Sequence, residues 1–227
     1  MILLEVLVEG KSDAPAIKEA LQRKFRLIEN FHFRVHAHKG KGKLPAKLLN
    51  KPDPKHRGLL DQLPAKLIGY GKSLQDGLVL VVIDADDTPP EQLAADLERM
   101  LTKLPIKPRV LFCLAVEETE SWFIADIAAL ELAYPKGLKK QILRNIEPDA
   151  VVGAWEKLAA ALSVDPKKVS GVDKYEWALR ISPHLDLDSP KSPSFNKLIT
   201  DLNIELKKFP EIVVSVPLGQ EFGARPE

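Results

Sequence analysis

An uninterrupted apolar run at residues 78–83 ends abruptly in carboxylates, and this feature constrains the fold more than any other. The run reads LVLVVI, and the acidic residues that follow are Asp84, Asp86 and Asp87. A turn-forming glycine, Gly77, precedes the run, and two prolines follow it. A strand that is apolar on both faces is typical of the interior of a parallel sheet covered by helices. We therefore expect an α/β protein with a mainly parallel sheet flanked by helices.

The acidic residues after this strand predict a cation site. Asp84 and Asp86 are two residues apart, so extended backbone would place both side chains on one side. Two like charges held this close raise each other's pKa unless a cation lies between them. Carboxylate oxygens at such a place suit Mg²⁺ or Mn²⁺. The alternative is that these residues and Thr88 merely cap a helix beginning near Pro90, although a cap needs only one of them.

Two other predicted strands also end in acids. Residues 1–8 are followed by Glu9, and residues 109–116 are followed by three glutamates, Glu117, Glu118 and Glu120. Because the carboxyl ends of parallel strands meet at one edge of a sheet, we expect these side chains to converge. Taken alone, Glu9 is as well explained as a turn residue.

Periodicity predicts the remaining elements. They are helices at 14–25 and 90–103, a strand at 31–38, a mostly helical region from 135, a late edge strand at 212–214 and a loose tail at 219–227. In the strand at 31–38, His32 and the other histidines would share an exposed polar face. We place an α/β domain at 1–132 and a helical extension packed on it at 133–227, with one compact domain as the alternative.

Composition excludes several classes of protein. Of the 227 residues, 45% are hydrophobic and 29% are charged, as in ordinary globular proteins. The single cysteine, Cys113, excludes a disulfide framework, and no apolar stretch approaches the ~18 residues needed to span a bilayer. The apolar start of the chain lacks the basic residues of a signal peptide and is interrupted by Glu5 and Glu9. We therefore expect a cytoplasmic protein with no membrane partner.

Charge is segregated along the chain although the net charge is only +1. Residues 38–73 contain nine Lys or Arg and two Asp, whereas residues 84–131 contain four Lys or Arg and eleven Asp or Glu. A basic flank beside an acidic centre suits a polyanionic substrate held next to a divalent metal. Within the flank, Lys39, Lys41 and Lys43 alternate with glycines in a loop that suits contact with backbone phosphates. A solvated linker explains this loop equally well.

Together these residues resemble the Toprim (topoisomerase–primase) domain. Its hallmark is a glutamate in the first strand–helix turn, here Glu9 after Leu7-Val8, and a later D-x-D pair, here Asp84 and Asp86. The stretch at 120–126, ESWFIAD, is similar to the E-x-W-x-x-A-D sequence of small stand-alone bacterial Toprim-like proteins of unknown function. Those proteins are related to nucleases of the overcoming-lysogenization-defect type. The resemblance covers roughly residues 1–130 and implies a Toprim-like, Rossmann-like fold.

The resemblance also implies roles for individual residues. Glu9 would be the general acid/base or a metal ligand, and Asp84 and Asp86 would bind Mg²⁺ or Mn²⁺. Glu120 would be a further metal ligand and Lys174, expected just before a helix, a cation for the transition state. Lys11 would join the three loop lysines in binding nucleic acid.

The implied function is metal-dependent cleavage of phosphodiester bonds in DNA or RNA, in a defence or repair system. An ATPase or another protein is an implied partner, because related nucleases carry an ATPase domain.

Two other functions compete with this one. Asp84 to Thr88 satisfies the D-x-D-x-T motif of haloacid-dehalogenase-type phosphatases, with Asp84 as nucleophile and Asp86 as acid/base. That reading leaves Glu9 unexplained, and the chain has no downstream G-D-x-x-x-D motif. The third reading is a non-catalytic Toprim module that binds nucleic acid or a protein.

Overall fold

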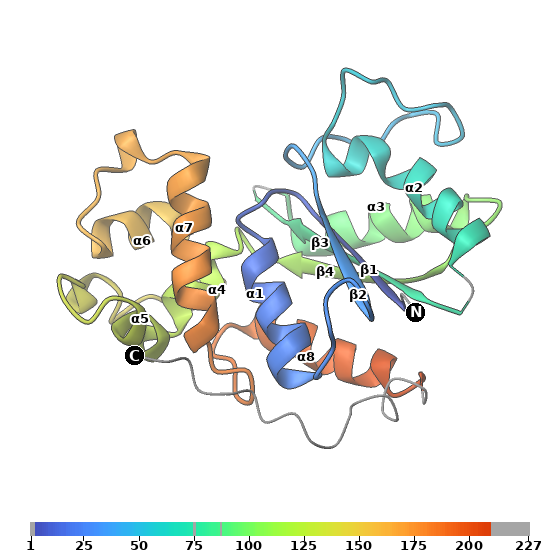
Figure 1. The fold of residues 1–227 in the computed structure, drawn as a ribbon. Coiled ribbons are helices and arrows are strands. Elements are labelled where there is room, and N and C mark those ends of the chain that lie inside the picture. Colours follow the sequence, from blue (N-terminus) through green and yellow to red (C-terminus); the bar gives the residue numbers. More distant parts are fainter. Residues whose placement is uncertain (1–2, 75, 87, 210–227) are drawn as a thin grey trace.

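Four parallel strands form the central sheet of the protein, which we describe from a computed structural model. The structure describes residues 3–74, 76–86 and 88–209. The strands are β1 (Leu4–Val8), β2 (Phe33–Ala37), β3 (Leu78–Asp84) and β4 (Arg109–Ala115). Their order is β2-β1-β3-β4 (Figure 1). The sequence-based prediction of an α/β fold with a parallel sheet is confirmed.

The register brings the ends of the strands to one edge of the sheet. Val8, the last residue of β1, pairs with both Ala37 and Val82, and Asp84 pairs with Ala115. The loops after β1, β3 and β4 therefore all leave from the same side. We call this side the carboxyl edge.

Helices cover both faces of the sheet. They are α1 (Ala14–Glu19), α2 (Leu59–Ser73), α3 (Pro90–Thr102), α4 (Glu120–Ala125), α5 (Ile127–Ala133), α6 (Ala154–Ala161), α7 (Gly171–Ile181) and α8 (Pro193–Leu206). A π-helical turn, η1 (Ala20–Lys24), extends α1, and short 3₁₀ turns lie at η2 (Lys140–Ile142), η3 (Pro166–Lys168) and η4 (Ser182–His184).

Alternation along the central strands creates two apolar cores. Val79, Val81 and Ile83 of β3 pack with α2 and α3, whereas Leu80 and Val82 pack on the opposite face. The core on that opposite face includes α1 and α8. As expected, the run at 78–83 is apolar throughout because both faces of β3 are buried.

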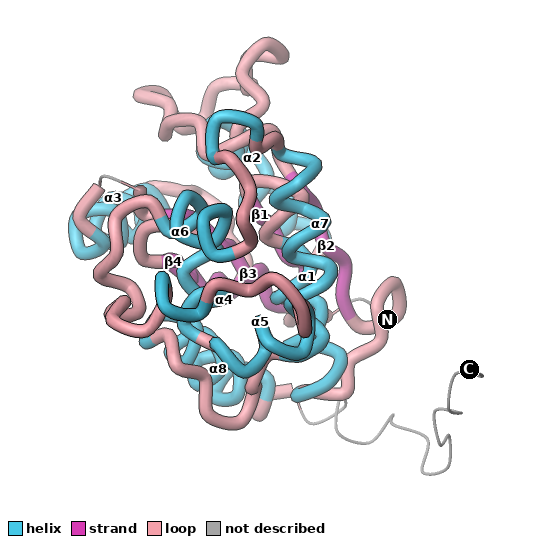
Figure 2. Tube along the Cα trace, turned by 90° about the vertical axis from the view of Figure 1, so that its left-hand side faces the viewer, coloured by secondary structure: helices cyan, strands magenta, loops and turns pink. Residues whose placement is uncertain are grey.

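The helical region after β4 packs onto the α/β part. Trp122 of α4, Leu158 of α6 and Ala178 of α7 belong to the same apolar core as Val6 of β1. In Figure 1, α5, α6 and α7 lie together to the left of the sheet, whereas the loop before α2 lies at the upper periphery. Figure 2 shows the same loop at the outer end of the molecule. A helical C-terminal part is confirmed, and the domain boundary after residue 132 stays a prediction.

The expectation for residues 31–38 is partly wrong. The strand begins at Phe33 because the chain turns tightly before it, with the backbone N–H of His32 donating to the carbonyl of Ile28. Phe31 is 51% exposed and His32 is 2% exposed, the reverse of their expected faces. The Nδ1 of His32 accepts a hydrogen bond from the N–H of Ile28, which gives the buried ring a partner.

Two further expectations lie outside the described residues, namely the edge strand at 212–214 and the tail at 219–227. Within the described part of the chain, every helix is too short or too polar to cross a membrane.

Candidate active site

Glu9 and Asp84 meet at the carboxyl edge. Glu9 follows β1 directly, and its Oε1 accepts a hydrogen bond of 2.9 Å from the backbone N–H of Asp84. This contact follows from the register, because β1 and β3 are neighbours and Val8 pairs with Val82. Glu9 is 8% exposed, and burial, followed by the charge of Asp13, raises its pKa to about 8. Two predicted site residues that lie 75 positions apart in the chain are thus adjacent in space.

Asp84 is surrounded by other carboxylate side chains. Its Oδ1 accepts a hydrogen bond of 3.2 Å from the backbone N–H of Thr119, which connects β3 to the loop after β4. Burial raises the pKa of Asp84 well above its usual range. The negative charges that raise it further belong to Asp13, Glu9, Glu120 and Asp86.

Asp13 is a member of the site that the sequence analysis missed. It is 5% exposed, and its carboxylate accepts hydrogen bonds from the backbone N–H of Gly10 (2.7 Å) and the hydroxyl of Thr119 (3.1 Å). Burial raises its pKa, and these hydrogen bonds partly oppose the increase. The side chain of Asp13 makes no cap hydrogen bond to α1 and instead joins the β1–α1 turn to the β4–α4 turn.

The backbone conformation at Asp86 differs from the predicted one. The strand ends at Asp84, and Asp86 has a φ of 48°, so the expectation of extended backbone through both aspartates is wrong. The Nζ of Lys41 donates to the carbonyl of Ala85 (3.0 Å) and to Oδ2 of Asp86 (3.1 Å). Lys41, predicted to bind nucleic acid, therefore contacts a predicted metal ligand. The Asp86 side chain is 49% exposed.

Lys174 bridges two glutamates after β4. Its Nζ lies 3.6 Å from Oε1 of Glu118 and 3.5 Å from Oε1 of Glu120. It also lies over the ring of Trp155, 4.7 Å from the centroid. Burial, followed by the charge of Glu120, raises the pKa of Glu118 to about 7. Burial also raises the pKa of Glu120, and Lys174 opposes that increase.

Two details of this group differ from the expectations. Lys174 lies inside α7 rather than before it, because Ser170 and Asp173 form a reciprocal cap that starts the helix at Gly171. Glu118 was expected at this edge with the other acids after β4 but was given no role, whereas it contacts Lys174 and its Oε2 accepts a hydrogen bond from the N–H of Trp155.

The other predicted nucleic-acid contacts lie around the same edge. Lys11 is exposed in the turn after β1, close in sequence to Glu9. Lys39 and Lys43 are exposed on either side of Lys41 in the loop after β2. The backbone N–H of Lys43 donates to Oδ1 of Asp61 at the start of α2.

The donor chemistry at the carboxyl edge fits a hard divalent cation. No group of three or more His, Cys, Asp or Glu side chains is ready to hold a metal in the part of the chain that the structure describes. Mg²⁺ does not require such a group, since it commonly keeps several waters and takes one or two carboxylates. Asp84 and Glu9 supply two, in surroundings where uncompensated negative charge is unfavourable.

Comparison with known proteins places the chain in a family. No curated protein and no solved structure matches this chain. Residues 8–203 match the model of a family described as a domain of unknown function, DUF4276. Since the match spans most of the chain, the protein belongs to the DUF4276 family.

Proposed function

We propose that the carboxyl edge is a Toprim-type site that cleaves phosphodiester bonds of nucleic acid with Mg²⁺ or Mn²⁺. The observation that carries the proposal is the contact between Glu9 and Asp84 at the ends of neighbouring parallel strands. A glutamate after the first strand beside an aspartate at the end of the third matches the arrangement that the sequence resemblance implies. The dense negative charge around Asp84 adds support, because it favours binding of a cation.

Asp84 and Glu9 would hold the cation. When bound, a divalent cation would neutralise charge that develops on the phosphoryl oxygens during cleavage. Asp86 and Glu120 lie close enough to add to the negative potential at Asp84, and each already has a lysine partner.

The two lysines have separate roles in this proposal. Lys41 orients Asp86 and presents positive charge at the edge where a phosphate would approach. Lys174 compensates Glu118 and Glu120, and its placement over Trp155 fixes the position of its charge. An ATPase or another protein partner is implied by the resemblance alone and stays a prediction.

The test is a cleavage assay with supercoiled plasmid and with labelled RNA. The wild-type protein should cleave at least one of these substrates with Mg²⁺ or Mn²⁺ and neither of them in EDTA. Asp84→Asn and Glu9→Gln should each lower the rate by about 10²-fold or more. The control Glu98→Gln, on the exposed side of α3, should leave the rate unchanged.

Other outcomes identify the competing functions. Hydrolysis of small phosphate esters that is lost in Asp84→Asn but kept in Glu9→Gln would indicate the phosphatase. Binding of nucleic acid without any turnover would indicate the non-catalytic module. Cleavage that persists in EDTA or in Asp84→Asn would contradict the proposed site.

A further inference from the structure

The loop between β2 and α2 is closed at its base by backbone hydrogen bonds. We call residues 39–57 the basic loop. The N–H of Lys39 donates to the carbonyl of Arg57, and the N–H groups of Leu59 and Leu60 donate to the carbonyls of Gly40 and Lys41. The two ends of the basic loop are therefore hydrogen-bonded to each other and to the first turn of α2.

Gly42 and Gly58 allow the two ends of the loop to come into contact. A Cβ on Gly58 would lie 2.5 Å from the Cα of Gly42, which is closer than real Cβ atoms come to other atoms. Gly42 also has a φ of +68°, a conformation that favours glycine. We call Gly42, Gly58 and Asp61 the neck of the loop. Asp61 holds it closed, because its carboxylate accepts hydrogen bonds from the N–H groups of Lys43 and Gly58.

Beyond the neck, the basic loop and α2 enclose a pocket of about 430 Å³. Leu44 and Leu48 line it and also pack against the apolar core under α2 and α3, so the loop is anchored by burial as well as by hydrogen bonds. Pro64 of α2 contributes to the wall. This volume lies in the range of pockets that hold small organic groups.

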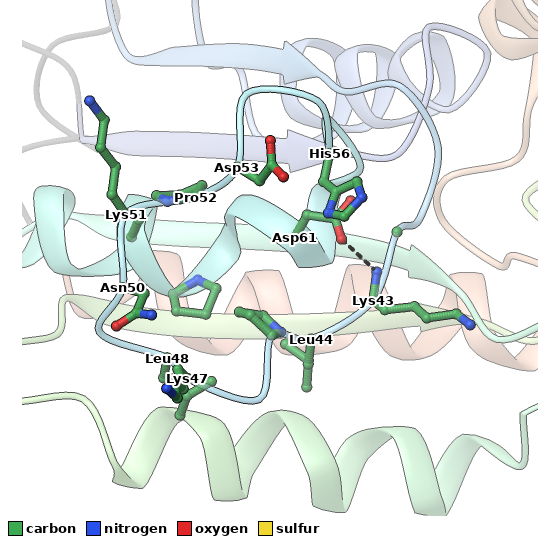
Figure 3. A pocket seen from close by; sticks show the side chains of 14 residues that line it. Lys43, Leu44, Lys47, Leu48, Asn50, Lys51, Pro52, Asp53, His56 and Asp61 are labelled. Atoms are coloured by element: carbon green, nitrogen blue, oxygen red, sulfur yellow. Dashed lines mark hydrogen bonds between the residues drawn. The ribbon is translucent and has the colours of Figure 1, made fainter.

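The lining of this pocket carries three lysines and two aspartates, which leaves an excess of positive charge. The lysines are Lys43, Lys47 and Lys51, and Figure 3 shows Lys43 and Lys51 on opposite sides of the pocket, extending away from each other. The two lining carboxylates accept hydrogen bonds from the backbone, Asp61 at the neck and Asp53 from the N–H of Lys55.

Among the described residues, none of the ion pairs involves these three lysines. Apolar walls under a cationic rim match a nucleotide, which has an apolar face and an anionic phosphate.

The pocket lies next to the candidate active site along the chain. Lys41 contacts Asp86, and Lys43, two residues later, lines the pocket. Two residues of chain span at most about 7 Å, so a nucleic-acid strand that crosses the carboxyl edge can continue into the pocket.

We infer that the pocket under the basic loop binds a nucleotide that neighbours the scissile phosphodiester in a single-stranded stretch of nucleic acid. The inference rests on the proposed function, because it assigns the same substrate a second point of contact. Each lysine contacts a phosphate of the strand, and the apolar wall receives the sugar or base.

The first experiment measures binding separately from cleavage. Fluorescence anisotropy with labelled single-stranded DNA and RNA is recorded in EDTA over a range of salt concentrations. The variant Lys43→Gln/Lys47→Gln/Lys51→Gln should bind at least about tenfold more weakly, and the slope of log K against log salt should decrease by about 2 for three lost contacts. The matched control Lys72→Gln/Lys103→Gln/Lys136→Gln removes the same charge from exposed positions outside the pocket and should change neither quantity.

The second experiment fills the pocket without changing charge. Ala65 lines the pocket from α2, so Ala65→Trp should weaken binding of the same oligonucleotides about tenfold. Ser73→Trp, at the exposed end of the same helix, is the control. Circular dichroism of each variant establishes that it is folded before binding is compared.

The outcomes separate this inference from the proposed function. Equal loss of binding in the pocket variant and its charge-matched control would overturn the nucleotide pocket, and metal-dependent cleavage by the wild type would still support the nuclease. Wild-type protein that neither binds nor cleaves any nucleic acid would overturn both. Selective weakening in both pocket variants supports the pocket.

Discussion

Glu9 and Asp84 illustrate how a buried carboxylate is tolerated at a strand end. Glu9 accepts the N–H that β3 presents at its last residue, and Asp84 accepts the N–H of Thr119. Each hydrogen bond favours the charged form of the carboxyl group, whereas burial and the neighbouring acids favour the neutral form. The second effect prevails at both residues, since both pKa values are raised.

Replacing Asp84 by a neutral residue should therefore abolish activity without lowering stability. In Asp84→Asn the repulsion with Glu9 and Asp13 is removed, so the metal-free variant should unfold at the same temperature as the wild type or a few degrees higher. Nucleic-acid cleavage should be lost in the same variant. Thermal unfolding in EDTA, measured beside the cleavage assay, checks both effects, and a large decrease in melting temperature would show that Asp84 has a structural role instead.

Removing Lys174 should have the opposite effect on stability. Lys174→Met leaves Glu118 and Glu120 without their cation, and breaking such a partly buried contact typically destabilises by about 1–3 kcal/mol. Lys174→Arg keeps the charge and should recover part of the loss. Urea unfolding of the two variants at pH 7.5 measures the difference, and equal stability of both variants and the wild type would contradict the bridge.

Some residues of the site could be predicted from the sequence and others could not. Glu9 and Asp84 were recognisable because each directly follows an apolar strand, and parallel strands end at a shared edge. Asp13 was missed because a short turn and a helix cap explain an aspartate there equally well, and only the folded chain brings Thr119 to it. The contact between Lys41 and Asp86 spans 45 positions, and no local pattern encodes it.

At the level of elements, the neck of the basic loop is tightly constrained. Gly58→Ala places a methyl group against the backbone of Gly42, so we expect a loss of about 1–3 kcal/mol and faster proteolysis within residues 43–57. Gly69→Ala is the matched control, because its Cβ meets no atom within 4 Å and alanine favours the helix. Unfolding and limited proteolysis of both variants check this, and an unchanged Gly58→Ala protein would contradict a tight neck.

The strands were predictable to the extent that burial controls their sequences. Residues 78–83 are apolar on both faces and form the interior strand β3. The edge strand β2 is half-exposed, so its pattern was weaker and its start was placed two residues early. The change from α1 to a π-helical turn at Ala20 leaves the apolar spacing of residues 14–25 intact, so periodicity alone does not reveal it.

For the whole molecule, the acidic edge predicts an unusual dependence of stability on pH. Glu9 and Glu118 have pKa values raised to about 8 and about 7 in the folded protein, above the 4.5 of the free side chain. The folded state therefore holds more protons than the unfolded state between about pH 4.5 and pH 8, and stability falls as pH rises through this range. In EDTA, the free energy of unfolding should decrease by on the order of a few kcal/mol between pH 5 and pH 8.

Bound cation should reverse this trend. Mg²⁺ or Mn²⁺ that binds only the folded state adds stability at pH 8, where the carboxylates are charged. Denaturant unfolding at several pH values, with and without metal, tests the coupling. A stability that rises from pH 5 to pH 8 in EDTA would show that the acidic edge is not strained.

The most direct test of the central claim is a crystal structure of the protein soaked in Mn²⁺, with anomalous diffraction data. The account predicts an anomalous peak at the carboxyl edge in contact with the carboxylates of Asp84 and Glu9, and no such peak in Asp84→Asn. A wild-type map with no peak at this edge, or with manganese bound only elsewhere, would contradict the account.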